Sequence, residues 1–259
     1  MPRQPSPLRP AHRHCGLVRA DDQAPQAEAE ALTWLQQREQ ALVDLVWQVL
    51  TGISVRRPNS ILDAGCGEGA TLARFVELAA PDLLTLTGIS LSRSQIDIAA
   101  RSLPQATWLV GDMLADPRLP TGQFEAVVAI QSTEYIGAAN LAAFMTKAAS
   151  CLAPQGTLLV VAGSWAAPAP AADAVVKLFQ HLSAAKPALT GDYYQAAQEA
   201  GLRLVGELDL APATMHYWRV CRDSPVLRRS PDGVIENGFY QALKAGRADY
   251  RLYLWQRPD

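Results

Sequence analysis

The residues best placed to do chemistry begin with a glycine-rich stretch at positions 61–71, ILDAGCGEGAT. Two apolar residues lead into an acid, and alternate glycines follow it, as in a buried strand that ends in a tight turn and starts a helix. Glycine permits left-handed backbone angles and close contact with a ligand, and the first N–H groups of the helix face that ligand. We therefore expect Asp63, Gly65, Cys66 and Gly67 to bind a cofactor. The alternative is a glycine-rich turn that holds no ligand.

A dinucleotide site is a second interpretation of this turn, but the spacing disfavours it. The third glycine of that fingerprint falls one residue later than Gly69, and an acid for the ribose usually follows roughly 20 residues on. Here the second predicted strand, residues 84–89, ends at Ser90. No carboxylate stands at its tip, which argues against a nicotinamide cofactor.

The third predicted strand, residues 108–110, ends in Gly111, Asp112 and Met113. A carboxylate can accept a hydrogen bond from the exocyclic amine of adenine while an apolar side chain covers the ring face. We expect Asp112 and Met113 to bind an adenine, with a plain turn residue as the alternative for Asp112.

The fourth predicted strand, residues 124–130, runs into the segment QSTEY at 131–135. A glutamate at the carboxyl end of a buried strand suits proton transfer, so we expect Glu134 to act as a catalytic base. A solvated or structural carboxylate is the alternative. Gln131 falls on the same rim and is expected to contact both the cofactor and the reacting groups.

Aromatic and basic side chains that suit a substrate lie in the N-terminal arm and from Trp165 onward. If the reaction forms a carbocation, aromatic faces would stabilise it; packing in the core is the alternative role. The aromatic candidates are Trp165, Tyr193, Tyr194, Tyr217 and Trp218. Basic side chains that could meet a diphosphate, with a divalent ion between, are His12, His14, His216, Arg219, Arg222 and Lys244, each of which alone suits a surface charge equally.

Strands that alternate with helices must position these residues. Each predicted strand is nearly all apolar, which favours a mostly parallel sheet with helices on both faces, and ligands bind such sheets at the carboxyl ends of the strands. The remaining predicted strands are 157–163, 203–210 and 249–255, the last pair antiparallel, which makes seven. Helices are predicted at 27–50, 71–78, 95–102, 140–152, 174–183, 192–200, around 217–218 and at 234–244.

Composition limits the functional classes. At 259 residues, 49% hydrophobic and 19% charged, the chain can bury one substantial core, and we expect one α/β domain at 27–259 after a flexible arm or lid at 1–26. Cap segments are expected at about 164–200 and 211–246. The net charge of −2 supplies no basic surface for nucleic acid, and no stretch has the length of a signal peptide or membrane span. Four scattered cysteines suggest neither a zinc site nor disulfides, so a reduced cytoplasm is the simpler setting.

Several blocks together resemble the terpenoid C-methyltransferases that act on prenyl diphosphates, relatives of the cyclopropane fatty acid synthase group. The D-x-G-x-G-x-G turn is similar to the S-adenosylmethionine (SAM) loop of class I methyltransferases. HRHCGL resembles the family's His-rich block, QSTEYI its N-E-S-T-M-Y block, and DLAPATMHYW with ENGFYQALKAGRADYRLYLW its closing segments. GISLSRSQ matches the turn in which a serine and a glutamine, here Ser90 and Gln95, replace the usual acid at the SAM ribose.

This resemblance implies a Rossmann-like class I methyltransferase that uses SAM to methylate an alkene carbon of an isoprenoid through a carbocation. It also implies Mg²⁺ where a diphosphate is bound, with His12, His14, Tyr193, Tyr217, Trp218 and Lys244 around the substrate, and Tyr194 facing the cation. Gln131 stands where the family carries its base, and Glu134 stands where cyclopropane synthases carry a glutamate. N- or O-methylation of another small apolar metabolite, and SAM binding without turnover, are the alternatives; a homo-oligomer remains open.

Overall fold

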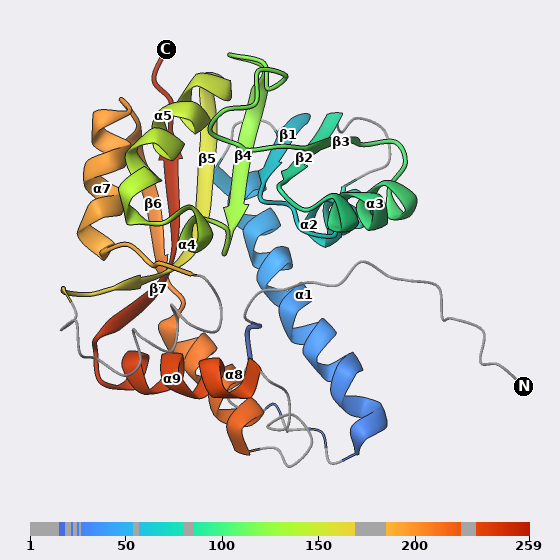
Figure 1. Cartoon of the computed structure of the whole chain (residues 1–259), viewed down its shortest axis with the longest axis vertical. Helices are drawn as coiled ribbons and strands as arrows, with labels where there is room; N and C mark the ends of the chain where they lie inside the picture. Colours follow the sequence, from blue (N-terminus) through green and yellow to red (C-terminus); the bar gives the residue numbers. More distant parts are fainter. Residues whose placement is uncertain are drawn as a thin grey trace, which may run out of the picture.

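A seven-stranded sheet runs through the computed structural model of the chain, in the order β3-β2-β1-β4-β5-β7-β6 (Figure 1). Its strands are β1 (Ser60–Ala64), β2 (Thr85–Ser90), β3 (Thr107–Val110), β4 (Phe124–Ile130), β5 (Leu152–Trp165), β6 (Arg203–Asp209) and β7 (Ala248–Gln256). Strands β1 to β5 pair in parallel, whereas β7 runs antiparallel to both β5 and β6. The predicted Rossmann-like, mostly parallel sheet is confirmed.

The structure describes residues 16–18, 22, 25, 27–53, 57–79, 85–168, 185–223 and 232–259. His12, His14 and the predicted helix 174–183 lie outside these ranges. The short described segment 16–18 contacts the first helix, since the backbone N–H of Leu17 donates to the carbonyl oxygen of Arg38 at 3.0 Å.

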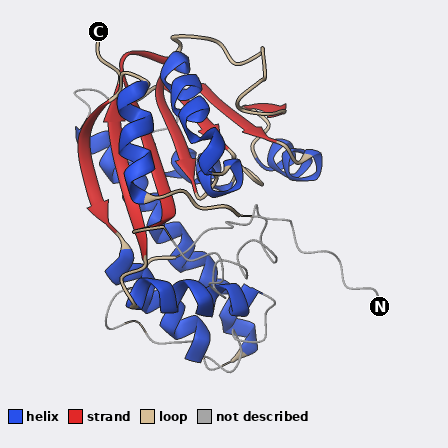
Figure 2. Ribbon diagram, turned by 60° about the vertical axis from the view of Figure 1, so that its left-hand side comes forward, coloured by secondary structure: helices blue, strands red, loops and turns tan. Residues whose placement is uncertain are grey.

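Helices cover both faces of the sheet, and a further group of helices lies beyond one end of it (Figure 2). The helices are α1 (Glu28–Ile53), α2 (Ala70–Leu78), α3 (Arg93–Ser102), α4 (Thr133–Ile136), α5 (Leu141–Cys151), α7 (Thr190–Glu199), α8 (Ala211–Asp223) and α9 (Asp232–Lys244), with a 3₁₀ turn at Ala138–Asn140. None of the helices in the described ranges is long and apolar enough to cross a membrane.

The side chains of β5 show how the sheet separates two cores. Because side chains alternate along a strand, Leu159 and Val161 join one core while Val160 and Ala162 join the other. The first core contains buried residues of α1, α2, α8 and α9, and the second contains those of α5 and α7. Figure 1 places α8 and α9 beyond the carboxyl ends of the parallel strands.

Most predicted elements occur where the sequence pattern places them, but three details differ. β5 extends over Leu152–Trp165, longer than the predicted 157–163. The four-residue helix α4 was not predicted. The segment 164–200 was expected to cap the site, yet its helix α7 packs on a face of the sheet beside α5, because Tyr193, Ala196 and Ala197 form one apolar stripe buried in the second core.

Candidate functional site

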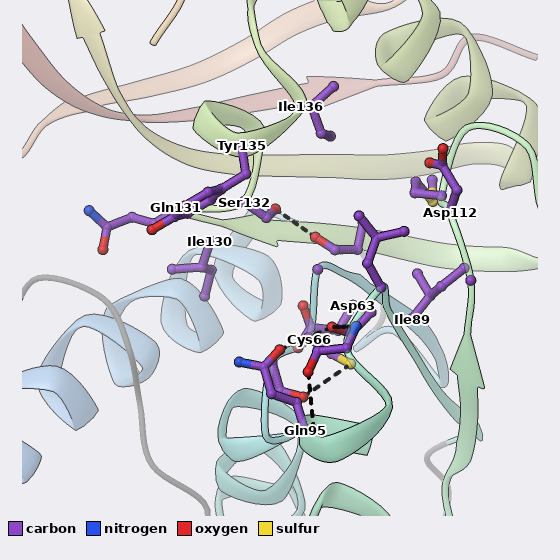
Figure 3. A pocket seen from close by; sticks show the side chains of 18 of the residues that line it. Asp63, Cys66, Ile89, Gln95, Asp112, Ile130, Gln131, Ser132, Tyr135 and Ile136 are labelled. Carbon is purple, nitrogen blue, oxygen red and sulfur yellow. Dashed lines mark hydrogen bonds between the residues drawn. The ribbon is translucent and has the colours of Figure 1, made fainter. Parts of the chain in front are cut away.

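A cavity of about 590 Å³ opens at the carboxyl ends of β1, β2, β3 and β4 (Figure 3). Four connections that are distant in sequence contribute its walls, as expected for an open α/β sheet. All of the predicted cofactor residues line it, namely Asp63, Gly65, Cys66, Gly67, Ser90, Gln95, Asp112, Met113 and Gln131. The fold therefore brings together the residues that were grouped from the sequence.

The glycine loop after β1 is shaped by a close neighbour on one side and open space on the other. Gly65 has φ +88°, and a Cβ there would lie 2.4 Å from the Cβ of Ser132. Ser132 Oγ in turn donates to the carbonyl oxygen of Ala64 at 2.6 Å. A Cβ on Gly67, at φ +53°, would meet no heavy atom nearer than Gln95 Nε2 at 3.9 Å. The backbone at Gly67 therefore faces the cavity, where a ligand can lie directly against it.

Asp63 is the most buried of the carboxyl groups that line this cavity. Its side chain is 2% exposed, and its Oδ2 atom has no hydrogen-bond partner among the described residues. Burial raises the pKa of this carboxyl from 3.8 to about 7. A buried carboxylate oxygen without a donor favours a ligand that brings one, such as an ammonium group.

The thiol of Cys66 lies beside this carboxyl. It is buried, and burial together with the charge of Asp63 raises its pKa well above the ordinary value. A thiol in this state stays protonated at neutral pH and is a poor nucleophile. Cys66 thus contributes shape and its backbone to the cavity.

Two polar groups occupy the tip of β2. Ser90 Oγ donates to Gln95 Oε1 at 3.1 Å and accepts from the backbone N–H of Ser92 at 3.2 Å. Because Gln95 Oε1 accepts this bond, its amide nitrogen is the part directed toward Gly67 and the cavity. This neutral pair stands where a carboxylate would serve a dinucleotide.

At the tip of β3, Asp112 and Met113 face the cavity in different ways. Asp112 is exposed, and its Oδ1 accepts from the backbone N–H of Leu114 at 2.9 Å, so one carboxylate oxygen stabilises the turn. Met113 is 7% exposed and presents an apolar surface. Both proposed roles of Asp112, as a turn residue and as a ligand acceptor, are compatible with this geometry.

Gln131 makes the turn between β4 and α4. Its φ is +48°, a left-handed conformation that costs a residue with a side chain about 1–2 kcal/mol. Its backbone N–H remains bonded to the carbonyl oxygen of Val161 at 2.8 Å. The turn places Ser132 against Gly65, and the helix that carries Glu134 begins directly after it. Strain held at a cavity wall is a common feature of ligand-binding sites.

Glu134 is on the same short helix, but its carboxyl is held away from the cavity wall. Oε1 accepts from the backbone N–H of Gly163 at 2.8 Å, and Oε2 accepts from Thr133 Oγ1 at 3.2 Å. The side chain is 7% exposed. Burial raises its pKa to about 7, against the opposing effect of hydrogen bonds from Gly163, its own backbone and Thr133. A carboxyl that titrates near neutral pH can act as a general base or acid.

Beyond Glu134, aromatic rings form a continuous series across the cap. Their successive centroids lie 5.4–6.4 Å apart, and the series joins α1 to β7 through Trp34, Tyr217, Trp218, Phe239 and Tyr250. Trp165 shares this core. A Cβ on Gly163 would lie 2.9 Å from the ring of Phe239 and 3.6 Å from Glu134 Oε1. The end of the aromatic series and the Glu134 carboxyl therefore meet at Gly163.

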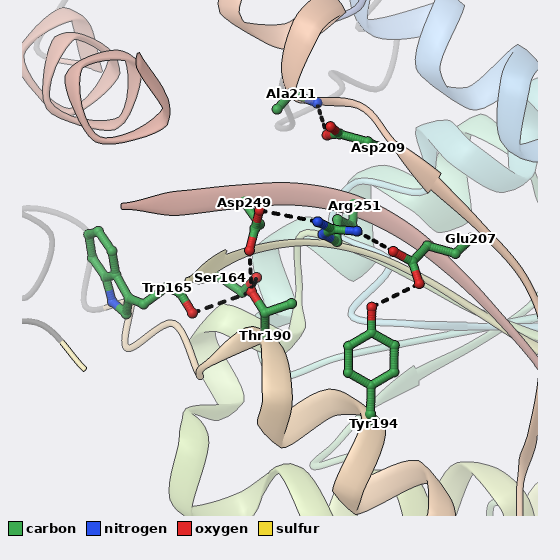
Figure 4. A network of polar contacts seen from close by, with 9 residues as sticks. All are labelled: Ser164, Trp165, Thr190, Tyr194, Glu207, Asp209, Ala211, Asp249 and Arg251. Carbon is green, nitrogen blue, oxygen red and sulfur yellow. Dashed lines mark hydrogen bonds and ion pairs between the residues drawn. The ribbon is translucent and has the colours of Figure 1, made fainter. Parts of the chain in front are cut away.

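The two predicted tyrosines of α7 belong to the other face of the sheet. Tyr194 donates from its hydroxyl to Glu207 Oε2 at 2.8 Å, and Arg251 pairs with the other oxygen of Glu207 (Figure 4). Burial, first, and Glu207 raise the pKa of Tyr194 to about 12. Neither Tyr193 nor Tyr194 lines the cavity. A role of Tyr194 in facing a cation remains a prediction, and its position in this network offers no direct support for it.

The basic residues of the cap are partly engaged with their neighbours. Arg219 bonds to His216 Nδ1 at 2.7 Å. Arg222 bonds to Asp223 at 2.7 Å and lies 4.8 Å from the ring centre of Tyr240. Lys244 is exposed at the end of α9. Within the described ranges, no group of three or more His, Cys, Asp or Glu residues could hold a metal ion.

Sequence reasoning left several contributors without a role. Leu91, Tyr135 and Ile136 line the cavity, and Phe239 and Tyr250 complete the aromatic series. Tyr135 and Ile136 lie in the QSTEYI block, and Phe239 and Tyr250 lie in the closing block. The sequence marks these blocks, but nothing in the local pattern indicates which of their residues face inward.

Comparison with known proteins agrees with this geometry. Residues 61–156 match the family model described as a methyltransferase domain. The solved structure of geranyl diphosphate C-methyltransferase from Streptomyces coelicolor A3(2), in complex with Mg²⁺, geranyl diphosphate and S-adenosyl-L-homocysteine, is similar with a TM-score of 0.79 and 20% identity, over 96% of this chain and 90% of that chain.

Two further structures share the fold at lower similarity. The [4+2]-cyclase SpnF has a TM-score of 0.70 and 20% identity, over 96% of this chain and 89% of that chain. The cyclopropane synthase MmaA2 from Mycobacterium tuberculosis has a TM-score of 0.69 and 16% identity, over 95% of this chain and 90% of that chain. At such identities, the likeness concerns the fold.

Proposed function

We propose that the chain is a class I SAM-dependent methyltransferase that transfers a methyl group to an alkene carbon of an isoprenoid, as a cytoplasmic enzyme of terpenoid secondary metabolism. The observation that carries the proposal is the position of Glu134. Its buried carboxyl and the ring of Phe239 both lie beside Gly163, and Tyr135 and Ile136 on the same helix line the cavity. An aromatic face and a base at one point are what a reaction through a carbocation requires.

The cavity residues suit SAM, a sulfonium compound that supplies an activated methyl group. Asp63 has a buried oxygen that lacks a donor and can accept from the ammonium of the methionyl end. The open backbone at Gly67 lets that part of the molecule lie against the chain. Ser90 and Gln95 can bond to ribose hydroxyls, and Met113 can cover adenine while Asp112 accepts from its amine. These residues would hold SAM and orient its methyl group. Such positioning can lower an activation barrier by roughly 7–11 kcal/mol.

The proposed reaction conserves atoms and electrons. The π electrons of the acceptor alkene form the new carbon–carbon bond while the carbon–sulfur bond breaks and leaves its electron pair on sulfur. The acceptor becomes a carbocation, which the nearby aromatic rings stabilise by on the order of 0.5–2 kcal/mol each. The Glu134 carboxylate then takes a proton from the neighbouring carbon, and the electrons of that C–H bond form the new alkene.

Gln131 has a supporting part in this scheme. The family that the sequence resembles carries its base at this position. A neutral amide cannot accept a proton as a carboxylate does, so Gln131 cannot take that role. The turn at Gln131 instead fixes the start of α4 and hence the position of Glu134. Trp165, Tyr217 and Trp218 are proposed to surround the acceptor, with Lys244, His12 and His14 as candidates for a diphosphate and its Mg²⁺.

The experiment that tests the proposal is incubation with labelled SAM and geranyl, farnesyl or isopentenyl diphosphate, with the products analysed by mass. We expect one acceptor to gain a methyl group and lose a proton. Glu134→Gln should suppress that product while binding of S-adenosylhomocysteine (SAH) is retained, and Glu199→Gln, at an exposed position on α7, is the matched control. No methylated product from any of the acceptors would contradict the isoprenoid assignment.

The same assay distinguishes the alternatives. Methyl transfer to an amine or hydroxyl of another small apolar metabolite would identify an N- or O-methyltransferase. SAH binding without transfer to any acceptor would favour a binding protein. Full turnover by Glu134→Gln would remove the base from Glu134 and leave only its structural role.

A further inference from the structure

Tyr193 is fixed in place by a column of stacked rings behind Glu134. Its side chain is fully buried, and its ring stacks on Tyr253 with centroids 5.2 Å apart and planes 10° apart. Tyr253 stacks in turn on Trp255 at 5.0 Å and 13°. This packing fixes the ring, and the hydroxyl of Tyr193 lies 2.8 Å from Thr133 Oγ1.

The direction of the hydrogen bonds follows from the number of protons available. Thr133 Oγ1 carries one proton and lies 3.2 Å from Glu134 Oε2. An ionised carboxylate can only accept, so the proton of Thr133 is directed to Glu134. Tyr193 must then donate its own proton to Thr133. The three groups form a chain of hydrogen bonds that ends on the carboxylate.

We propose that Thr133 and Tyr193 are positioning residues that hold Glu134 in its ionised, proton-accepting form, with Tyr193 acting through Thr133. The inference rests on the proposed function, because it concerns the charge of the proposed base. In the opposite direction, a protonated Glu134 would donate to Thr133, and Thr133 would donate to Tyr193. The phenolic proton of Tyr193 would then point away from Thr133, inside a buried site of stacked rings. The chain therefore favours the ionised carboxylate.

The surroundings of Glu134 make these hydrogen bonds decisive. No ion pair joins Glu134 to any residue in the described ranges. The nearest titratable side chain on α7 is Tyr193, which bonds to Thr133. The other titratable residues of α7 are Asp192, Tyr194 and Glu199, and those of β7 are Asp249, Tyr250, Arg251 and Tyr253. Arg251, the cation among them, pairs with Glu207 and Asp249. Lys186 approaches through its backbone N–H, which donates to the carbonyl oxygen of Glu134 at 2.7 Å. Burial disfavours the ionised form of Glu134, and the hydrogen-bond donors around its carboxyl, among them Thr133, favour it.

The test is an infrared titration of the protonated carboxyl band of Glu134 in the SAH-saturated protein, with Glu134→Gln used to assign the band. Thr133→Val keeps the shape of the side chain but removes the donor, and should raise the midpoint by roughly one to two pH units, the effect of one hydrogen bond to a charged group. Thr133→Ser, the matched control, should titrate as the wild type does. A Thr133→Val midpoint equal to or below that of the wild type would overturn the proposal.

Tyr193→Phe is the second variant, in case Thr133→Val does not fold. Loss of the phenolic donor weakens the bond from Thr133, since linked hydrogen bonds strengthen each other by roughly 10–30%. We expect a midpoint shift in the same direction but smaller than for Thr133→Val. An unchanged or lowered midpoint would show that Tyr193 serves only to pack the core.

The titration needs no acceptor, so its outcome is separate from that of the proposed reaction. Shifted midpoints in a protein that methylates none of the isoprenoids would support the hydrogen-bond chain and refute the proposed function. If methyl transfer is found, the acid limb of the rate against pH should move upward in Thr133→Val, because the base is active only when ionised.

Discussion

Gly88 provides a quantitative test of how Trp108 packs against the glycine loop that follows β1. A Cβ at this position of β2 would lie 2.4 Å from Trp108 Cζ3, 2.6 Å from Cε3 and 2.9 Å from Cys66 Sγ. The indole cannot retreat easily, because its Nε1 donates to the carbonyl oxygen of Leu103 at 3.0 Å and its Cη2 lies 2.5 Å from the Cβ position of Gly69. Gly88→Ala should therefore lower the free energy of unfolding by about 1–3 kcal/mol, the usual cost of overpacking.

A double-mutant cycle with Trp108→Leu isolates this effect. Leucine removes the ring atoms that reach Gly88 and leaves only the close approach to Cys66 Sγ, so the alanine should cost less in that background, with a coupling of about 0.5–3 kcal/mol between the two sites. Urea unfolding measures the free energies, and SAH calorimetry should show weaker binding by Gly88→Ala because the displaced indole pushes on Gly69. Gly52→Ala, where a Cβ meets nothing within 4 Å, is the control. Equal costs of Gly88→Ala in both backgrounds, within about 0.5 kcal/mol, would refute the reasoning.

Three further predictions concern charge, backbone strain and the α7 network. Burial raises the pKa of Asp63 from 3.8 to about 7 in the folded protein, so the free energy of unfolding should fall as pH rises from about 4 to 7. Asp63→Asn should lessen that fall in urea titrations. An unchanged dependence on pH would contradict the burial argument. Gln131→Gly and Gln155→Gly both relieve a left-handed conformation, but only the former should weaken SAH binding by calorimetry, since Gln131 lines the cavity and Gln155 does not. Tyr194→Phe removes the bond to Glu207 and should cost about 1 kcal/mol of stability while the rate of methyl transfer is unchanged; a large loss of rate would return a catalytic part to the tyrosine.

The sheet and the cofactor cavity could be predicted because their signals are local. The glycine spacing after β1 specifies a turn within seven residues, and apolar strands alternating with amphipathic helices specify the parallel sheet. Parallel strands end on the same rim, so Ser90, Asp112 and Gln131 could be grouped with Asp63 although they are far apart in the sequence.

The surroundings of the proposed base could not be predicted, since they depend on contacts between distant segments. Thr133 and Tyr193 are 60 residues apart, and Glu134 and Gly163 are 29 apart. Helix α4 is too short to show a periodic pattern. Strand parity places Trp165 on the same face as Val161, but nothing local states that Tyr193, on a helix, docks on the opposite face.

The four-residue helix α4 also has a thermodynamic consequence. Tyr135 and Ile136 border the cavity, whereas Glu134 on the same turn bonds to Gly163 beside the ring of Phe239, so one short helix contacts both the cavity and the aromatic series. Any ligand that displaces this helix from one side changes the fit on the other. If donor and acceptor bind as proposed, reciprocity requires that each alters the affinity of the other by the same factor, and α4 is the element through which that coupling would pass.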